Sequence, residues 1–445
     1  MSPLKIGTSD LEADDDTALR GHPSFSQTLR VFGRIGLLSF GGPTAQIALM
    51  HREIVERQGW LKEQQFLNGL SFCMLLPGPE AMQLATYAGW RLHGLIGGLA
   101  AGLLFVLPGA FLVLALAMIY VSFGHVALLQ AVFLGVKAAV LVIVIEALLR
   151  VAKRALLRKV DWVIAALSFI GIFFISIPFP LVIFLAAIAG FLAATPGGET
   201  LDAEPEKGSL SIGSALRTAG LWLGIWLIPL AAVVLIFGEG HVLSKLSVFF
   251  SKLAVVTFGG AYAVLAYMTQ EVVQYHGWLS AGEMLDGLGL AETTNGPLIL
   301  VTEFVGYLAA YRFGEGTPVL MGLLGAAITL WATFAPCFLW VFTGAPFIER
   351  LQHAPKLRGA LAGVTAAVVG VILNLSVWFG LHVLFRSVEA TSLGPMTLWL
   401  PDVSTLDPKA LTFAVVAAVA LLRLHLGLAW TLLLAGGLSL VWHGI

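Results

Sequence analysis

The sequence predicts an all-α polytopic membrane protein built from two inverted-topology repeats, with broken or half helices at the repeat interface. Composition gives the first indication. Of 445 residues, 58% are apolar and 11% are charged, whereas about one quarter of a soluble protein is charged. Several stretches without Lys, Arg, Asp or Glu offer the roughly 20 residues that a spanning helix needs: 94–136, 162–198, 218–238, 317–348 and 359–385. An internal repeat and a charge reversal between its copies are the other two indications.

The two halves of the chain share motifs of helix-breaking residues at one constant spacing. Phe40-Gly41-Gly42-Pro43 returns 218 positions later as Phe258-Gly259-Gly260. The same offset relates Gly59-Trp60-Leu61 to Gly277-Trp278-Leu279, and Pro77-Gly78-Pro79 to Asn295-Gly296-Pro297. Chance pairing of apolar segments does not produce a constant offset, so we expect a duplicated unit. Because irregular backbone at membrane depth survives only where protein or water satisfies it, these breaks are expected to line a binding cavity.

The first repeat is expected to combine broken helices with long spanning ones. Pro43 suits the first turn of a new helix, and the residue before Pro77 resists helical backbone. The expected helices are, in order, residue 25 to the Gly-Gly break, Thr44 to Arg57, 60–76, Glu80 to His93, 94–120 with a bend at Pro108, 130–149, and a hairpin of 162–177 and 180–195.

The rest of the chain divides into a tail, a linker and the second repeat. Residues 1–24 are polar and acidic and are expected to form a disordered cytosolic tail, after which the first repeat covers 25–195. Residues 196–244 combine an acidic linker containing Pro, Gly and Ser with an extra transmembrane helix at 216–237. The second, inverted repeat covers 245–445.

Basic residues at segment ends switch sides between the two copies. Residues 35–93 contain four basic side chains, whereas the matching segment 253–311 contains none and carries five acidic ones. The basic run 150–159 corresponds to a segment of mixed charge in the second copy. Because Lys and Arg mark cytoplasmic loops, this reversal indicates inverted repeats. We expect a multi-pass protein of the inner (plasma) membrane with a cytoplasmic N-terminus.

Cations beside the helix breaks are the first candidates for a substrate site, since charges inside apolar segments are costly. Arg34 and Lys252 stand at equivalent positions before the two Phe-Gly-Gly motifs and could meet an anion between the halves. Alternatively, they extend to the membrane surface as ordinary helix-end cations. Helix N-termini and polar side chains at the breaks could donate to the same anion or cap the broken backbone. The anion-binding candidates are Arg34, Lys252, Ser39, Gly41, Gly42, Pro43, Thr44, Gly78, Pro79, Thr257, Gly259, Gly260, Asn295, Gly296 and Lys137.

One predicted span carries two further ionisable side chains, Lys137 and Glu146. Their counterparts in the second copy, Thr365 and Asn374, are polar but uncharged. We interpret Lys137 as a third charge that attracts the anion and Glu146 as a candidate for proton coupling. An ion pair with another helix is the alternative for both.

Signatures of other function classes are missing from the sequence. The two cysteines, Cys73 and Cys337, lie in apolar surroundings and support neither a disulfide nor a metal site. No zinc-protease, phosphate-loop or dinucleotide motif occurs in a suitable context. We therefore expect no catalytic residue, no metal, no cofactor and no nucleic-acid partner.

The motifs resemble those of the chromate ion transporter family, long two-repeat type. The resemblance rests on Phe40-Gly41-Gly42-Pro43, Leu76-Pro77-Gly78-Pro79 and their second-copy equivalents, and it covers the chain from about residue 25 to 445. It implies a bacterial cytoplasmic-membrane carrier that exports chromate and confers chromate resistance, with sulfate as the natural competitor. The second copy departs from the pattern with Ala261 in place of the proline and Asn295 in place of Pro77, which predicts an asymmetric site.

The residues by themselves indicate a secondary transporter for an anion, and chromate comes from the resemblance. Two alternatives stay open. The same architecture could carry sulfate or another oxyanion, or the protein could be a structural or lipid-handling membrane protein whose breaks only permit tight packing. The expected partners are chromate, sulfate as a competitor and the lipid bilayer, and a homodimer is left open.

Overall fold

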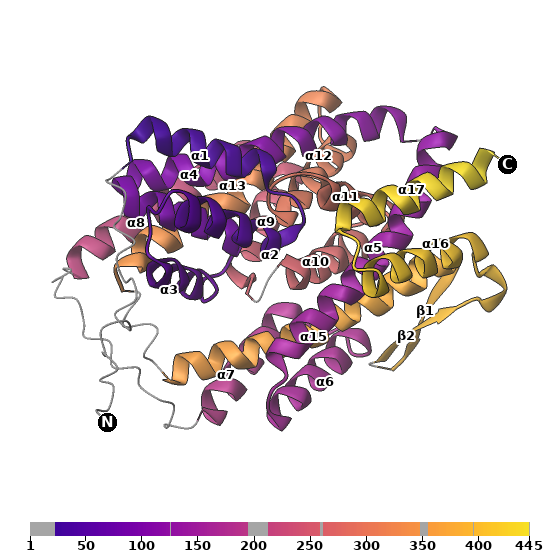
Figure 1. Cartoon of the computed structure of the whole chain (residues 1–445). Helices are drawn as coiled ribbons and strands as arrows, with labels where there is room; N and C mark the ends of the chain where they lie inside the picture. Colours follow the sequence, from indigo (N-terminus) through magenta and orange to yellow (C-terminus); the bar gives the residue numbers. More distant parts are fainter. Residues whose placement is uncertain are drawn as a thin grey trace, which may run out of the picture.

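The computed structural model in Figure 1 describes residues 23–124, 126–194, 212–258, 261–347, 355–394 and 396–444. Nearly all of the predicted tail, most of the acidic linker, and Gly259 with Gly260 lie outside the described residues. Within them the protein is helical, which confirms the all-α class. Five helices are long and apolar enough to cross a membrane: α4 (Glu80–Phe123), α5 (Ala127–Ala155), α8 (Ile212–Phe237), α13 (Pro318–Gly344) and α15 (Pro355–Leu384).

The remaining helices are shorter than a membrane is thick. In the first copy they are α1 (Phe25–Leu38), α2 (Gly42–His51), α3 (Glu63–Cys73), α6 (Lys159–Phe173) and α7 (Phe179–Ala193). In the second copy they are α9 (Val242–Val256), α10 (Ala261–Thr269), α11 (Ala281–Thr293), α12 (Val301–Phe313), α16 (Pro408–Ala418) and α17 (Leu428–Gly444). π-helical turns extend α2, α10 and α16 over Arg52–Arg57, Gln270–Tyr275 and Val419–Arg423, and short 3-10 turns lie at Leu298–Leu300, Ala345–Phe347 and Val403–Thr405.

Chain breaks occur where the glycine and proline motifs predict them. α1 ends at Leu38, and α2 begins at Gly42. Gly41 and Gly42 have backbone φ angles of +89° and +77°, which side chains rarely adopt. Within α4, His93 and Gly94 depart from helical geometry. This kink divides α4 into a short helix, close to the expected Glu80–His93 piece, and a long span.

Local structure recurs at the offset read from the motifs. The π-helical turns at Arg52–Arg57 and Gln270–Tyr275 are 218 residues apart, as are Gly59 (φ +63°) and Gly277 (φ +62°). Identical backbone irregularities at matching positions are strong signs that the two halves share one architecture. The helix order α1–α7 is accordingly repeated by α9–α17, with α8 as the extra helix between them.

The hairpin at the end of each copy packs on the long helix of the other copy. In Figure 1, α6 and α7 lie along α15, while α16 and α17 lie along α5. Glycines permit these close crossings. A Cβ atom added to Gly363 of α15 would lie 2.3 Å from the Ala186 carbonyl oxygen of α7, and one on Gly135 of α5 would lie 2.1 Å from that of Ala435 in α17. Small residues at helix crossings allow this backbone approach in lipid.

A β-hairpin that the sequence analysis did not predict follows α15. β1 (Val388–Leu393) and β2 (Met396–Pro401) pair antiparallel, from Val388 opposite Pro401 to Leu393 opposite Met396. The Thr397 amide donates to the Phe174 carbonyl at 2.7 Å and ties the hairpin to the turn between α6 and α7. An isolated two-stranded hairpin is marginal in water, so this tertiary contact explains why local sequence did not reveal it.

Candidate functional site

The four chain breaks meet in reciprocal pairs at the interface between the copies. The Gly78 amide of the first copy donates to the Thr257 carbonyl of the second, at 2.8 Å. The Gly296 amide of the second copy donates to the Ser39 carbonyl of the first, at 2.9 Å. Each bond is the image of the other at the 218-residue offset. Such reciprocity is the mark of two-fold related surfaces, and it collects the predicted break residues in one place.

Left-handed glycines make this meeting sterically feasible. Gly78 and Gly296 have φ angles of +119° and +91°. A Cβ atom on Gly78 would lie 3.1 Å from the Cys337 sulfur, next to Pro336 within α13. One on Gly296 would lie 3.4 Å from the Cα of Gly109, next to Pro108 within α4. Each loop therefore crosses a proline-containing spanning helix of the opposite copy.

Two buried glutamines hold the breaks, and the sequence analysis missed both. The Gln46 amide nitrogen donates to the Gly296 carbonyl at 2.6 Å and to the Ser39 carbonyl at 3.3 Å, while that of Gln83 donates to Pro77 at 2.7 Å. The side-chain oxygens of both are buried without a hydrogen-bond partner. Uncharged glutamines give no signal in a search for intramembrane charges. The available clue is that both glutamines lie beside breaks of the first copy, whereas the matching positions of the second copy are Val264 and Val301.

Polar break residues found by the sequence analysis divide between capping and exposure. The Ser39 and Thr257 hydroxyls donate to carbonyls one turn back in their own helices, Ile35 at 2.6 Å and Leu253 at 2.5 Å. The Asn295 amide nitrogen donates to the Gly36 carbonyl at 3.2 Å and so joins the two copies. Thr44 is exposed, and the N-termini of α2 and α4, at Gly41 to Pro43 and at Pro79, have no side-chain cap. These N-termini retain unpaired amides suited to an anion.

The paired cations Arg34 and Lys252 are both exposed. Lys252 lines an open cleft of about 530 Å³ beside α9, together with Glu239, Lys245 and Glu271. Among the described residues, neither Arg34 nor Lys252 takes part in an ion pair. The structure thus places one of the two cations in a cleft of mixed charge and the other on the outer face of α1.

Lys137 lies at a second, larger cleft that the sequence analysis did not foresee. This cleft, about 990 Å³, opens between the ends of α4, α5, α11, α12 and α17. The Lys137 ammonium is 3.1 Å from Oδ1 of Asp286, whose side chain is only 6% exposed. The Tyr120 hydroxyl donates to the other oxygen, Oδ2, at 2.8 Å. Arg312 and Glu283 form another ion pair on the cleft wall. The residues are far apart in sequence, which is why spacing could not pair them.

Glu146 belongs to a third group at the other end of the α5–α11 interface. It accepts three hydrogen bonds from the Arg150 guanidinium one turn along α5, the shortest at 2.5 Å. This pair faces Glu292 of α11, which is 6% exposed and accepts a 2.8 Å hydrogen bond from the Tyr262 hydroxyl of α10. Glu146 therefore pairs within its own helix and adjoins a buried carboxyl group. No group of three or more His, Cys, Asp or Glu side chains within the described ranges is arranged to hold a metal ion.

Comparison with known proteins places this chain in a transport family. Two blocks of the chain, residues 26–191 and 244–440, match the family model described as Chromate transporter. The chain is 32% identical over 366 residues to the Chromate transport protein of Cupriavidus metallidurans, which covers 80% of this chain and 84% of that relative. It is 33% identical over 357 residues to the Chromate transport protein of Pseudomonas aeruginosa, with 78% and 79% covered.

A third relative is the Probable chromate transport protein of Synechococcus elongatus, 30% identical over 384 residues that span 82% of this chain and 88% of the relative. No solved structure matches the chain. The relatives are named as transport proteins, in agreement with the expectation that the chain is not an enzyme. With two matched blocks that follow the two copies and similarity to three such proteins over 78–82% of its length, the chain belongs to the chromate transporter family.

Proposed function

We propose that the protein is a secondary transporter that exports chromate across the bacterial cytoplasmic membrane and so confers chromate resistance. The observation that carries the proposal is the reciprocal pair of bonds, Gly78 to Thr257 and Gly296 to Ser39. It concentrates broken helices between two related copies inside an apolar protein. Discontinuous helices at the interface of inverted repeats are where secondary transporters bind substrate. Family membership adds chromate as the substrate.

Helix lengths support an inverted arrangement. α1 and α9 have 14 and 15 residues, short of the roughly 20 that cross a bilayer. Between their starts lie the candidate spans α4, α5 and α8, an odd number. The two copies then begin on opposite sides of the membrane. This parity agrees with the charge reversal and supports the predicted domain limits, with the extra helix turning the second copy over.

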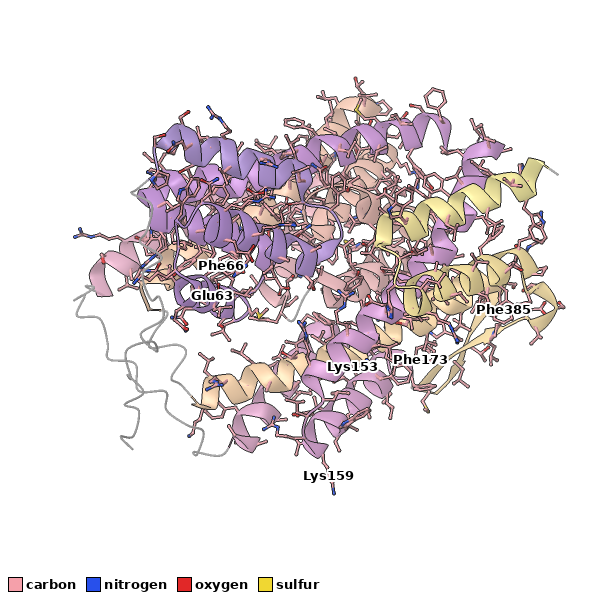
Figure 2. All side chains as sticks on the ribbon, viewed as in Figure 1. Glu63, Phe66, Lys153, Lys159, Phe173 and Phe385 are labelled. Carbon is pink, nitrogen blue, oxygen red and sulfur yellow. The ribbon has the colours of Figure 1, made fainter. Side chains whose placement is uncertain are left out.

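The side on which the N-terminus lies follows from the basic residues. Lys153 and Arg154 end α5, while Arg158 and Lys159 begin α6. Figure 2 shows Lys159 and Phe173 at opposite ends of α6, with Lys159 pointing away from the helices. Since such basic loops are cytoplasmic, the α5–α6 turn and the N-terminus are assigned to the cytoplasm. If α1 starts on the cytoplasmic side, the two crossings by α4 and α5 return the chain to that side at the α5–α6 turn.

The membrane potential favours outward movement of a dianion. Each charge moved across 100 mV is worth about 2.3 kcal/mol, so expulsion of a dianion from a negative-inside cell gains about 4.6 kcal/mol. In the proposal, Arg34, Lys252 and Lys137 attract chromate, and the uncapped N-termini of α2 and α4 with the break residues contact it. The side-chain oxygens of Gln46 and Gln83, which have no hydrogen-bond partner, accept hydrogen bonds from the amides of these N-termini or from protonated substrate.

Chromate flux into and out of liposomes containing the purified protein tests the proposal. Under an imposed potential, negative on the side that contains chromate, we expect the protein to release labelled chromate faster than protein-free liposomes do. Unlabelled sulfate should slow this release if the site accepts both tetrahedral dianions. A protein that moves sulfate but not chromate would reassign the substrate. One that moves neither would favour the structural or lipid-handling alternative.

A further inference from the structure

The α5–α11 interface carries a line of ionisable groups. At one end Lys137 faces Asp286 and Tyr120, and at the other Glu146 and Arg150 face Glu292 and Tyr262. We refer to these seven residues as the charged seam. On α11, Asp286 and Glu292 are six residues apart, or about 9 Å along the helix axis.

The positions that correspond to the seam at the repeat offsets carry different side chains. At the motif offsets, Asp286 corresponds to Asn68, Glu292 to Met74 and Lys137 to Thr365. Glu146, Arg150 and Tyr262 correspond to Asn374, Trp378 and Thr44 in the same way. Every charged member of these pairs is uncharged in the other copy. The corresponding helices of the other copy therefore form without these charges, so the charges are not required for helix formation.

Burial makes the charges of Asp286 and Glu292 costly. The Asp286 and Glu292 side chains are each at most 6% exposed. A carboxylate in such a place must be paired or become protonated. Asp286 is within reach of the Lys137 charge, but its Oδ1 has no aligned hydrogen-bond donor. Among the described residues, the hydrogen bond that Glu292 accepts comes from a neutral tyrosine hydroxyl, and Arg150, the cation whose charge acts on it, is already bound to Glu146. Both acids are thus in positions where binding a proton removes an incompletely compensated charge.

Access from solvent differs at the two ends. Asp286 lines the cleft of about 990 Å³, whereas Glu146 and Arg150 are part-exposed at the α5 end that bears the basic turn. The charged or titratable groups around Asp286 are Lys137 on α5, Tyr120 on α4, Glu283 on its own helix, Arg312 on α12 and His443 on α17. Those around Glu292 are Tyr262 on α10 and the Glu146–Arg150 pair on α5. The seam therefore connects a cleft on one side with the basic surface on the other.

We propose that the charged seam binds and transfers the protons that are coupled to anion export, with Asp286 and Glu292 as the proton-binding groups and Glu146 as the exit toward the basic surface. The inference rests on the proposed transport function and identifies its coupling ion. A proton enters from the cleft onto Asp286, is passed to Glu292 as the helices rearrange, and leaves past Glu146. The seam contains three carboxylates and two cations, a net charge of −1, so one bound proton brings its net charge to zero.

The test measures protons and chromate together in liposomes that contain the full-length protein and a trapped pH-sensitive dye. Wild-type protein is expected to move protons against the direction of chromate flow. Glu292→Gln should abolish this proton movement but retain exchange of labelled for unlabelled chromate, which needs no net proton transfer. Exposed Glu389 on β1 provides the matched control, since Glu389→Gln removes a carboxylate away from the seam and should leave both fluxes unchanged.

Replacement of Asp286 alone would leave the Lys137 ammonium without its partner, so both residues are replaced together. Lys137→Thr combined with Asp286→Asn installs the pair of side-chain types that the other copy carries at these positions. We expect this double variant to remain folded, to exchange chromate and to lose proton movement. Infrared titration of the purified proteins gives a readout independent of transport. The absorption of a protonated carboxyl group should lose one titrating component in Glu292→Gln and not in Glu389→Gln.

The outcomes separate the inference from the function on which it rests. Chromate flux without proton movement in the wild type would overturn the inference and leave chromate transport standing. Retention of coupled proton movement by both seam variants would also overturn it, because other groups would then carry the proton. Absence of chromate flux in the wild type would refute the proposed function itself.

Discussion

At the scale of single residues, Gly78 and Gly296 are positions at which the interface between the copies tolerates little change. Both have left-handed backbone, in which a side chain costs about 1–2 kcal/mol. A methyl group on Gly78 would also lie 2.9 Å from the Gln83 amide nitrogen, a donor already used by Pro77. We predict that Gly78→Ala and Gly296→Ala each lower the thermal stability of the purified protein and slow chromate flux.

Gly220 in α8 is the matched control for this prediction. Its backbone is helical, and nothing lies within 4 Å of an added Cβ atom. Gly220→Ala should therefore keep or slightly raise stability, since alanine favours a helix over glycine by about 1 kcal/mol. If Gly78→Ala matched Gly220→Ala in both stability and flux, the paired breaks would not be the functional centre.

Residue identity alone showed where the backbone breaks but not which side chains would meet. Glycine and proline act on their own backbone, so the breaks at Gly41 and Gly78 could be predicted from the sequence. The contact between Lys137 and Asp286 joins helices far apart along the chain, and no local rule relates them. Arg34 and Lys252 illustrate the converse, because matching positions in two copies do not have to face each other.

At the scale of elements, the exchange of hairpins between the copies is the main packing interaction between α7 and α15. Gly363 permits it, since a Cβ atom there would meet the Ala186 carbonyl oxygen at 2.3 Å and the Gly190 Cα at 2.9 Å. We predict that Gly363→Val separates these helices and destabilises the protein by about 1–3 kcal/mol, the usual cost of overpacking. Loss of monodisperse protein on heating measures the effect.

The control for this element is Gly437 of α17, which has open space around its Cβ position. Gly437→Val should be nearly neutral. Equal heat sensitivity of the two variants would mean that β-branching in a helix, and not the α7–α15 contact, caused the loss.

Predicted elements agree with the structure wherever a single segment determines its own form. Apolar length predicted the spans, and Pro43 and Pro77 predicted ends of the short helices. The β1–β2 hairpin and the exchange of α6–α7 with α16–α17 were not predicted, because both depend on contacts with distant chain. The π-helical turns also carry no compositional mark, although their repetition at the 218-residue offset is evident once the structure is known.

At the scale of the whole molecule, the two copies are in different packing states. α10 packs on α15 and α11 packs on α5. Among the described residues, no comparable packing joins the equivalent helices α2 and α3 to α5 or α15. In a pair of inverted repeats, such asymmetry is expected of one end of a transport cycle, in which the interface closed in one copy is open in the other. The opposite end of the cycle should exchange these roles.

Cysteine cross-linking tests this exchange of roles. A Cβ atom on Gly289 of α11 would lie 2.3 Å from a methyl of Val136 in α5, so Gly289→Cys with Val136→Cys should form a disulfide in the present state. The pseudo-symmetric pair is Ser71 in α3 and Val364 in α15. We predict that Ser71→Cys with Val364→Cys cross-links only when the α11–α5 interface opens. Both pairs should be studied after replacement of the buried Cys73 and Cys337 by alanine.

Chromate gradients and membrane potential should shift the two cross-links in opposite directions, because a disulfide needs Cα atoms within about 7 Å and so reports one packed interface at a time. Each cross-link should stop chromate flux, and reduction should restore it. Proteins carrying only one of the four substituted cysteines control for effects of substitution alone. If the Ser71–Val364 pair never formed under any gradient while the Gly289–Val136 disulfide left transport intact, the two interfaces would not alternate, and the asymmetry would be a fixed property of the fold.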